Sequence, residues 1–211
     1  MTPPRSPDPA GSPLEPSDTV FVDVDTQVDF VEPSGALYVP TAETLKPAFL
    51  RLLDAARRHG RPVVASADAH PKGDPEFAVF PPHCLAGSSG AQRVAETDPG
   101  DARVISADGE RVRGDGATTL LEKQTFDLFD NPAATGVFAA LGVKTAVVFG
   151  VALDYCVRAA ALGLVERGYQ TIVVRDATAP VTREGGEATA AELTAAGVRF
   201  MSTDDVVQAF P

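Results

Sequence analysis

Short apolar runs rich in β-branched residues alternate with single helical patterns along most of the chain, and this alternation restricts the fold more than any other feature. Runs without polar alternation are typical of strands buried on both faces, and single helices between them indicate βαβ units. We therefore predict an α/β fold: a single-domain, doubly wound, mostly parallel six-stranded sheet with helices on both faces. The predicted strands are residues 19–24 (TVFVDV), 62–67, 119–123, 144–150, 169–176 and 198–202, and the predicted helices are residues 42–59, 132–141, 155–167, 184–196 and 204–209.

Two segments depart from this rhythm. Residues 1–17 contain six prolines and almost no apolar side chains, which predicts a disordered Pro-rich tail followed by one domain over 18–211. Residues 68–116 are rich in Pro, Gly and Asp and hold two of the three histidines. Long excursions in compact domains are usually functional or disordered, so this segment is a candidate location for a site.

Net charge and cysteine usage exclude several partners. Lys and Arg total 18 against 29 Asp and Glu, a formal net charge of −11, and such a surface repels nucleic acid and anionic lipid. No apolar run approaches the roughly 18 residues of a membrane span, and the N-terminus lacks the apolar core of a secretion signal. We predict a cytoplasmic protein with two free cysteines, a small-molecule ligand and no nucleic-acid or membrane partner, while a homo-oligomer stays open.

Side chains suited to catalysis follow the carboxyl ends of four predicted strands. Asp25 follows the first strand and Asp68 the second, Lys123 ends the third, and Cys156 begins the helix after the fourth. In open parallel sheets, sites lie beyond the carboxyl ends of the strands, so these four residues should meet at one edge.

Cys156 is the candidate nucleophile at this edge. A helix N-terminus offers free N–H groups and partial positive charge, which lower a thiol pKa and can bind an oxyanion. Lys123 would add a full positive charge, and Asp25 would accept the thiol proton. The alternative is that Cys156 is a small buried group in a packed helix, with Asp154 as the N-cap.

The long segment also supplies a candidate metal site. Asp68, His70 and His83 combine one carboxylate with two imidazoles, a donor set that divalent ions accept. Glu76 would be a fourth ligand or hold a water, whereas Cys84 is less suitable because adjacent side chains point apart. Such loose spacing is also compatible with ordinary surface groups.

Five segments together resemble the motifs of the isochorismatase-like cysteine hydrolases, and FPPHC with the upstream Asp-x-His is similar to nicotinamidases in particular. The segments are VFVDVDTQVDF (20–30), ADAHP (67–71), FPPHCLAG (80–87), LEKQTFDLF (121–129) and FGVALDYCV (149–157). The resemblance covers about residues 19–203. It implies the isochorismatase-like fold and an Asp–Lys–Cys catalytic set, which falls here on Asp25, Lys123 and Cys156.

The same resemblance implies further site residues. A cis peptide would join Val151 and Ala152, and the N–H groups of Ala152 and Cys156 would form an oxyanion hole. A divalent metal ion (zinc, iron or manganese) would hold the ring nitrogen of the substrate. Its implied ligands are Asp68, His70 and His83.

These assignments predict a cysteine amidohydrolase that converts nicotinamide to nicotinate and ammonia through a thioester acyl-enzyme. Phe30, Phe80 and Phe126 would bind the substrate. Many nicotinamidases have a third histidine where this chain has Glu76, a Trp where it has Phe80, and often a Tyr where it has Phe126. Another small carboxamide therefore stays an alternative substrate.

A second resemblance gives an alternative in another class. FVDVDT (21–26) resembles the opening motif of haloacid-dehalogenase-like phosphatases. Asp23 would then be the nucleophile, Asp25 the acid/base and Lys123 the phosphate clamp, with Asp204 and Asp205 beside magnesium. This interpretation leaves the cysteine and the FPPHC element unexplained, so the amidohydrolase is favoured.

Overall fold

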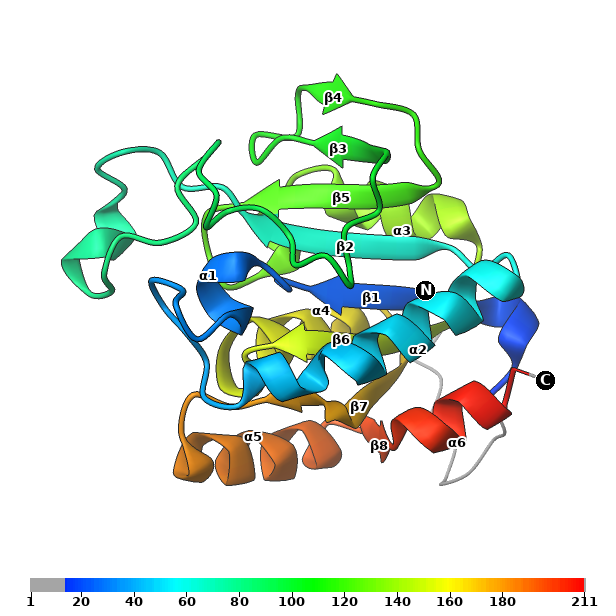
Figure 1. Cartoon of the computed structure of the whole chain (residues 1–211). Coiled ribbons are helices and arrows are strands. Elements are labelled where there is room, and N and C mark those ends of the chain that lie inside the picture. The colour runs from blue at the N-terminus through cyan, green and yellow to red at the C-terminus, as the bar shows by residue number, and fades with distance from the viewer. Residues whose placement is uncertain (1–13, 211) are drawn as a thin grey trace.

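The structure, a computed structural model that describes residues 14–210, is built on one eight-stranded sheet (Figure 1). The strand order is β4-β3-β5-β2-β1-β6-β7-β8, and every neighbouring pair is parallel except β3 and β4. The predicted α/β fold with a mostly parallel sheet is confirmed. The strands are β1 (Thr19–Val24), β2 (Val63–Asp68), β3 (Ala102–Ile105), β4 (Val112–Arg113), β5 (Thr118–Lys123), β6 (Thr145–Val151), β7 (Gln170–Ala179) and β8 (Arg199–Met201).

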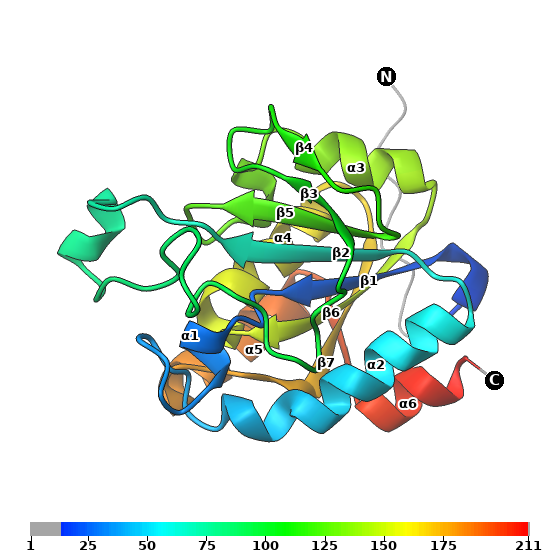
Figure 2. The ribbon, with the colours of Figure 1, turned by 45° about the horizontal axis from the view of Figure 1, so that its top comes forward.

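Helices cover both faces of the sheet, as the doubly wound prediction requires. Figures 1 and 2 show α2 and α6 crossing one face side by side, with α4 behind the sheet. Alternate side chains of β1 enter two cores: Phe21 packs in the core that α2 and α6 share, whereas Val20 and Val22 pack in the core of α3, α4 and α5. The helices are α1 (Val28–Val31), α2 (Lys46–Arg58), α3 (Ala134–Leu141), α4 (Arg158–Glu166), α5 (Arg183–Ala195) and α6 (Thr203–Gln208).

The sheet has eight strands rather than the predicted six, because β3 and β4 lie inside the segment 68–116. β3 has only four residues and β4 only two, and most of their side chains are half-buried or exposed. Neither strand therefore forms an apolar run that sequence patterning can detect. β3 pairs in parallel with β5, and β4 pairs antiparallel with β3 at the edge of the sheet.

The segment before β1 lies only partly within the described residues. Of the tail predicted over residues 1–17, residues 1–13 lie outside them. Leu14 is only 7% exposed and packs in the core of α2, and Pro16–Asp18 form a 3₁₀ turn directly before β1. Within residues 14–210, no helix is long and apolar enough to cross a membrane.

Two unusual backbone positions, Asp25 and Gly150, lie at the carboxyl edge of the sheet where β1 ends. Asp25 has a φ of 49°, which residues other than glycine seldom adopt, and the chain leaves the sheet there towards α1. Gly150 of β6 pairs with Val24, and a Cβ on this glycine would lie 2.0 Å from the Val24 carbonyl oxygen. Only glycine lets β6 pass so close to β1, and the candidate site is built just beyond these two strands.

Candidate active site

Asp25, Lys123 and Cys156 meet at this edge, as the strand pattern predicts. Nζ of Lys123 lies 2.8 Å from Oδ2 of Asp25 and 3.6 Å from Sγ of Cys156. Lys123 ends β5, Asp25 directly follows β1, and Cys156 lies in a π-helical turn, Leu153–Val157, that leads into α4. All three residues are buried. The ammonium group therefore lies between a carboxylate and a thiol, away from water, while the catalytic roles of the three residues stay predictions.

Asp68, the last residue of β2, connects this cluster to the two histidines. Its Oδ1 accepts a hydrogen bond from Nζ of Lys123. Its Oδ2 lies 3.7 Å from Nε2 of His70 and 4.0 Å from Nε2 of His83. One buried ammonium thus faces two carboxylates, those of Asp25 and Asp68. Because buried charge is costly unless it is paired, additional positive charge on the histidine side would stabilise the arrangement.

Burial and the strongest neighbouring charge act in opposite directions on the pKa values of Asp25, Lys123 and Cys156. It raises the pKa of Asp25 above the usual carboxyl range, although the charge of Lys123 opposes this. It also raises the pKa of the Cys156 thiol well above the usual range, again against Lys123. Burial lowers the pKa of Lys123, but the Asp25 and Asp68 carboxylates outweigh it and hold that pKa well above the usual range. Burial thus outweighs the lowering of the thiol pKa that the sequence pattern predicts.

The two histidines turn the same ring nitrogen towards Asp68. Nδ1 of His83 lies 2.9 Å from the carbonyl oxygen of Pro81, which can only accept, so Nδ1 carries the proton. Nδ1 of His70 lies 3.0 Å from Oδ2 of Asp74, which favours the same tautomer. Nε2 of His70 is buried and has no hydrogen-bond partner among the described residues. The donor atoms of Asp68, His70 and His83 lie within 4.8 Å of one another, so the set fits a divalent metal ion.

Glu76 lies at the margin of this donor set, with Oε1 3.8 Å from Nε2 of His83. Asp74 was not predicted from the sequence. It contacts His70 and also N-caps the 3₁₀ turn Pro75–Ala78 that carries Glu76. A signal for Asp74 was present, because histidine ligands usually donate their second N–H to a carboxylate or carbonyl, and Asp74 follows His70 by four residues.

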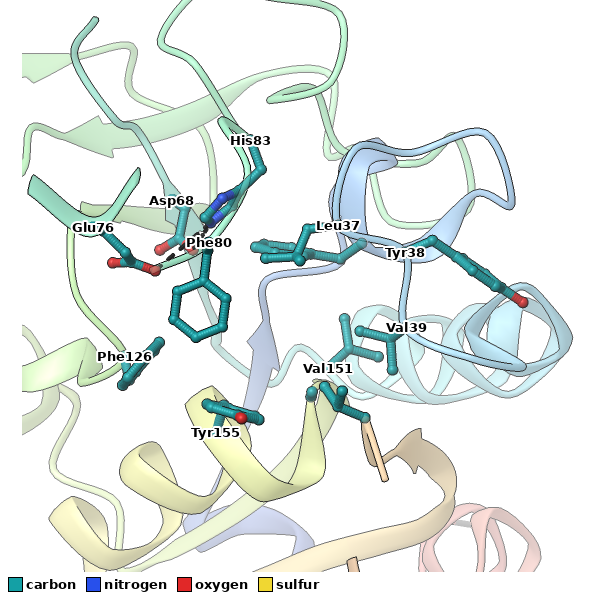
Figure 3. Close-up of a pocket in the computed structure, with 13 residues that line it drawn as sticks. Leu37, Tyr38, Val39, Asp68, Glu76, Phe80, His83, Phe126, Val151 and Tyr155 are labelled. Atoms are coloured by element: carbon teal, nitrogen blue, oxygen red, sulfur yellow. Dashed lines mark ion pairs between the residues drawn. The ribbon is translucent and has the colours of Figure 1, made fainter. Parts of the chain in front are cut away.

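A pocket of about 540 Å³, part of it open to solvent, lies against these groups (Figure 3). Asp68, Glu76 and His83 form one wall of the pocket in Figure 3, and aliphatic side chains form the opposite wall. Figure 3 shows the ring of Phe80 between the two walls, with Phe126 and Tyr155 below it. The predicted substrate-binding residues Phe30, Phe80 and Phe126 all border the pocket, and their role stays a prediction.

Several further lining residues escaped the sequence analysis. The ring of Tyr155 lies 5.3 Å from that of Phe126 and 6.1 Å from that of Phe80, centroid to centroid. Its place beside Cys156 was a usable signal. The aliphatic wall gave none, because its members come from separate segments without a periodic pattern. They include Leu37, Val39, Val151 and Val181.

The peptide bond between Val151 and Ala152 is cis, as the resemblance implies. Ala152 borders the pocket, and its carbonyl oxygen accepts hydrogen bonds from the amides of Tyr155 and Val157 at 3.1 Å each. This places the helical turn that carries Cys156 directly after the cis bond. The amides of Ala152 and Cys156 as an oxyanion hole stay a prediction.

Asp23 has partners of its own, and the phosphatase alternative is not supported. The Asp23 carboxylate pairs with Arg93 and accepts a hydrogen bond from Thr26 at 2.9 Å. The neighbours of Asp25 are different, since its carboxylate contacts Lys123 and accepts a hydrogen bond from Ser66 at 2.6 Å. Both oxygens of the Asp23 carboxylate are thus occupied by other side chains, so Asp23 is not free to act as a nucleophile.

The acids that this alternative placed beside magnesium are also engaged elsewhere. Asp204 forms an exposed ion pair with Arg51, at 2.6 Å. Asp205 forms a capping box with Ser202 at the start of α6. Neither belongs to the cluster around Lys123.

Comparisons with known proteins show which family the chain resembles. The isochorismatase domain family matches residues 19–205. The nicotinamidase/pyrazinamidase of Mycobacterium tuberculosis is 31% identical over 186 residues, which cover 84% of this chain and 95% of that protein. The maleamate amidohydrolase of Pseudomonas putida is 26% identical over 154 residues, which cover 72% of this chain and 68% of that protein.

Solved structures share the fold. The pyrazinamidase of Pyrococcus horikoshii, solved in complex with zinc, superposes with a TM-score of 0.75 at 25% identity. The superposition covers 88% of this chain and 99% of that one. Because the family match extends over nearly the whole described chain and the predicted catalytic residues meet within it, this chain belongs to the isochorismatase family.

Proposed function

We propose that the chain is a cysteine amidohydrolase whose substrate is nicotinamide. The observation that carries the proposal is the buried Lys123 between Asp25 and Cys156, beside a pocket that has aromatic rings and a metal-competent wall. None of the described residues that border this pocket is a lysine or arginine. Such a pocket favours a flat, neutral amide over a substrate that carries a carboxylate.

Asp25 handles the protons of this reaction. Its carboxylate accepts the thiol proton as Sγ of Cys156 attacks the amide carbonyl carbon. The developing oxyanion lies against the amides of Ala152 and Cys156, each worth about 3–4 kcal/mol of the barrier. Asp25 then gives the proton to the departing nitrogen, and ammonia leaves a thioester behind.

The second half of the reaction reverses these roles. Asp25 accepts a proton from a water molecule, which attacks the thioester carbonyl carbon. The C–S bond breaks, the cysteine recovers its proton, and the carboxylic acid is released as nicotinate. Lys123 stays protonated throughout and stabilises the negative charge that passes between sulfur and carboxylate.

Asp68, His70 and His83 would hold a divalent metal ion, since their donor atoms converge and Nε2 of His70 is buried without a hydrogen bond among the described residues. As a Lewis acid, such an ion would bind the pyridine nitrogen and orient the ring. The zinc in the related pyrazinamidase structure supports zinc as the first choice. Phe80 and Phe126, whose rings are 6.0 Å apart, would border the bound ring.

An ammonia-release assay with nicotinamide, benzamide and maleamate tests the proposal. Benzamide has the same size as nicotinamide but no ring nitrogen, and maleamate carries a carboxylate. We expect turnover in the order nicotinamide, benzamide, maleamate, with a chelator removing most of the difference between the first two. Preference for maleamate would favour the second candidate that the Pseudomonas putida relative suggests, and no ammonia from any amide would overturn the proposal.

A further inference from the structure

The side chain of Gln27 takes over the sheet pairing of Asp68 where β1 ends. β1 pairs with β2 only as far as Val24 and Ser66, and the chain leaves the sheet at Asp25. On its other side, Asp68 is still paired with β5. Without a substitute for β1, the backbone N–H and C=O of Asp68 would be buried with no partner on that side.

Gln27 supplies this substitute through three hydrogen bonds. Its Oε1 accepts from the amide of Asp68, and its Nε2 donates to the carbonyl of Asp68, both at 2.8 Å. Nε2 also donates to the carbonyl of Ala91 at 2.9 Å, in the segment that follows the loop of His83. Gln27 is completely buried, and its amide uses both donor hydrogens and the acceptor.

Asp68, which Gln27 holds in this way, contacts both the catalytic candidate Lys123 and the two candidate metal ligands His70 and His83. Oδ1 of Asp68 accepts from Lys123, while Oδ2 faces His70 and His83. A shift of the Asp68 backbone would move both oxygens at once. We propose that Gln27 is a positioning residue, which fixes the Asp68 backbone so that one carboxylate serves Lys123 and the metal ligands together. This inference rests on the metal site of the proposed function and adds to it a residue that contacts neither metal nor substrate.

Two substitutions at this position separate packing from hydrogen bonding. Gln27→Met keeps the length and most of the volume but removes all three hydrogen bonds. Gln27→Glu keeps an acceptor for the Asp68 amide and places a second oxygen against the carbonyls of Asp68 and Ala91. A role in packing alone would tolerate Met, whereas a positioning role tolerates neither substitution.

The test is a Zn²⁺ titration of the apoproteins against a chromophoric chelator, which needs no turnover. Both variants should bind Zn²⁺ about 10–100-fold more weakly than the wild type, the usual effect of removing a group that orients a ligand. Arg61→Met is the matched control, because Arg61 also donates to three backbone carbonyls but at the opposite edge of the sheet. Arg61→Met should lower the melting temperature but leave the Zn²⁺ affinity within about twofold of the wild type, because Arg61 lies far from the proposed metal ligands.

Each outcome decides the proposal. Wild-type Zn²⁺ affinity in folded Gln27→Met, or in Gln27→Glu where the Met variant does not fold, overturns the role of Gln27 and leaves the proposed function standing. An equal loss of affinity in Arg61→Met overturns it as well, because affinity would then follow global stability. No Zn²⁺ uptake by the wild type would refute the metal site itself, and this inference with it.

Discussion

The proposed catalytic half of the site (Asp25, Lys123 and Cys156) and the proposed metal half (Asp68, His70 and His83) differ in how closely their charged groups approach one another. In the catalytic half, Lys123 contacts the carboxylates of Asp25 and Asp68 and the thiol of Cys156 within the protein itself. In the metal half, Nε2 of His70 is buried without a hydrogen bond to any of residues 14–210, and it lies 3.7 Å from Oδ2 of Asp68. The charged groups of the first half are thus already in close contact, whereas those of the second lie about 4 Å apart, at a spacing that the proposed ion would bridge. Changes in the first should abolish chemistry, and changes in the second should weaken binding.

The largest effect should come from Cys156→Ala, with Cys84→Ala as its matched control. Removing the nucleophile should lower kcat by about 10⁴-fold or more. Cys84 is buried as well, and burial raises the pKa of its thiol, but it has no predicted role. Cys84→Ala should keep turnover within about tenfold of the wild type, an allowance for repacking a buried site. Steady-state ammonia release measures both, and substantial turnover in folded Cys156→Ala would end the cysteine-hydrolase interpretation.

Asp25→Asn and Lys123→Met come next, with losses of kcat of about 10²–10⁴-fold. Asn cannot accept the thiol proton, and Met leaves the charges of Asp25 and Asp68 without their shared ammonium. Asp23→Asn is the control for Asp25→Asn, since Asp23 is a buried aspartate only two residues earlier but pairs with Arg93. Near-normal turnover in Asp25→Asn would mean that another group is the base.

Loss of a metal ligand should act mainly on substrate binding. His70→Ala and His83→Ala should raise the KM for nicotinamide by about 10–100-fold, in step with lost metal affinity. Alkylation of Cys156 by iodoacetamide should be much less affected, because the thiol contacts Lys123 and not the histidines. Metal analysis of the purified proteins provides the second readout. Full metal occupancy in both variants would remove the ligand assignment and the difference between the two halves.

The pH profile should also report the burial of Asp25. Burial raises its pKa above the usual 3.8, and Asp25 must be ionised to accept the thiol proton. Activity should therefore fall as pH falls through this raised pKa, about tenfold per pH unit below it. The charge of Lys123 lowers the pKa of Asp25, so removing it should raise that pKa further. The acidic limb of the pH profile of Lys123→Met should therefore lie at higher pH than that of the wild type. An acidic limb at the same pH in both proteins would contradict the electrostatic interaction between Lys123 and Asp25.

Sequence patterning predicted which side chains converge at the site better than it predicted the contacts that hold them there. Asp25 and Lys123 lie at the ends of strands whose apolar runs are strong, so their common edge follows from topology alone. The contacts that finish the site join residues far apart in the chain. Arg93 pairs with Asp23, and Gln27 pairs with the Asp68 backbone across 41 positions. Such long-range contacts leave no periodic pattern in the sequence. The short strands β3 and β4 also escaped prediction, because most of their side chains are half-buried or exposed.

Substitution of Glu76 should have the smallest effect on metal binding, and it tests whether Glu76 belongs to the ligand set. Its Oε1 lies 3.8 Å from Nε2 of His83, near enough to complete the donor set when an ion draws the groups together. A carboxylate suits manganese or iron better than zinc, whereas an imidazole suits zinc. Glu76→Gln should therefore weaken Mn²⁺ binding about three- to tenfold more than Zn²⁺ binding, and Glu76→His should shift the preference towards Zn²⁺ by a similar factor. Titration of each apoprotein with both ions gives the ratio of the two dissociation constants directly. An unchanged ratio in both variants would limit the ligand set to Asp68, His70 and His83, and Glu76 would then act only through its charge at the pocket wall.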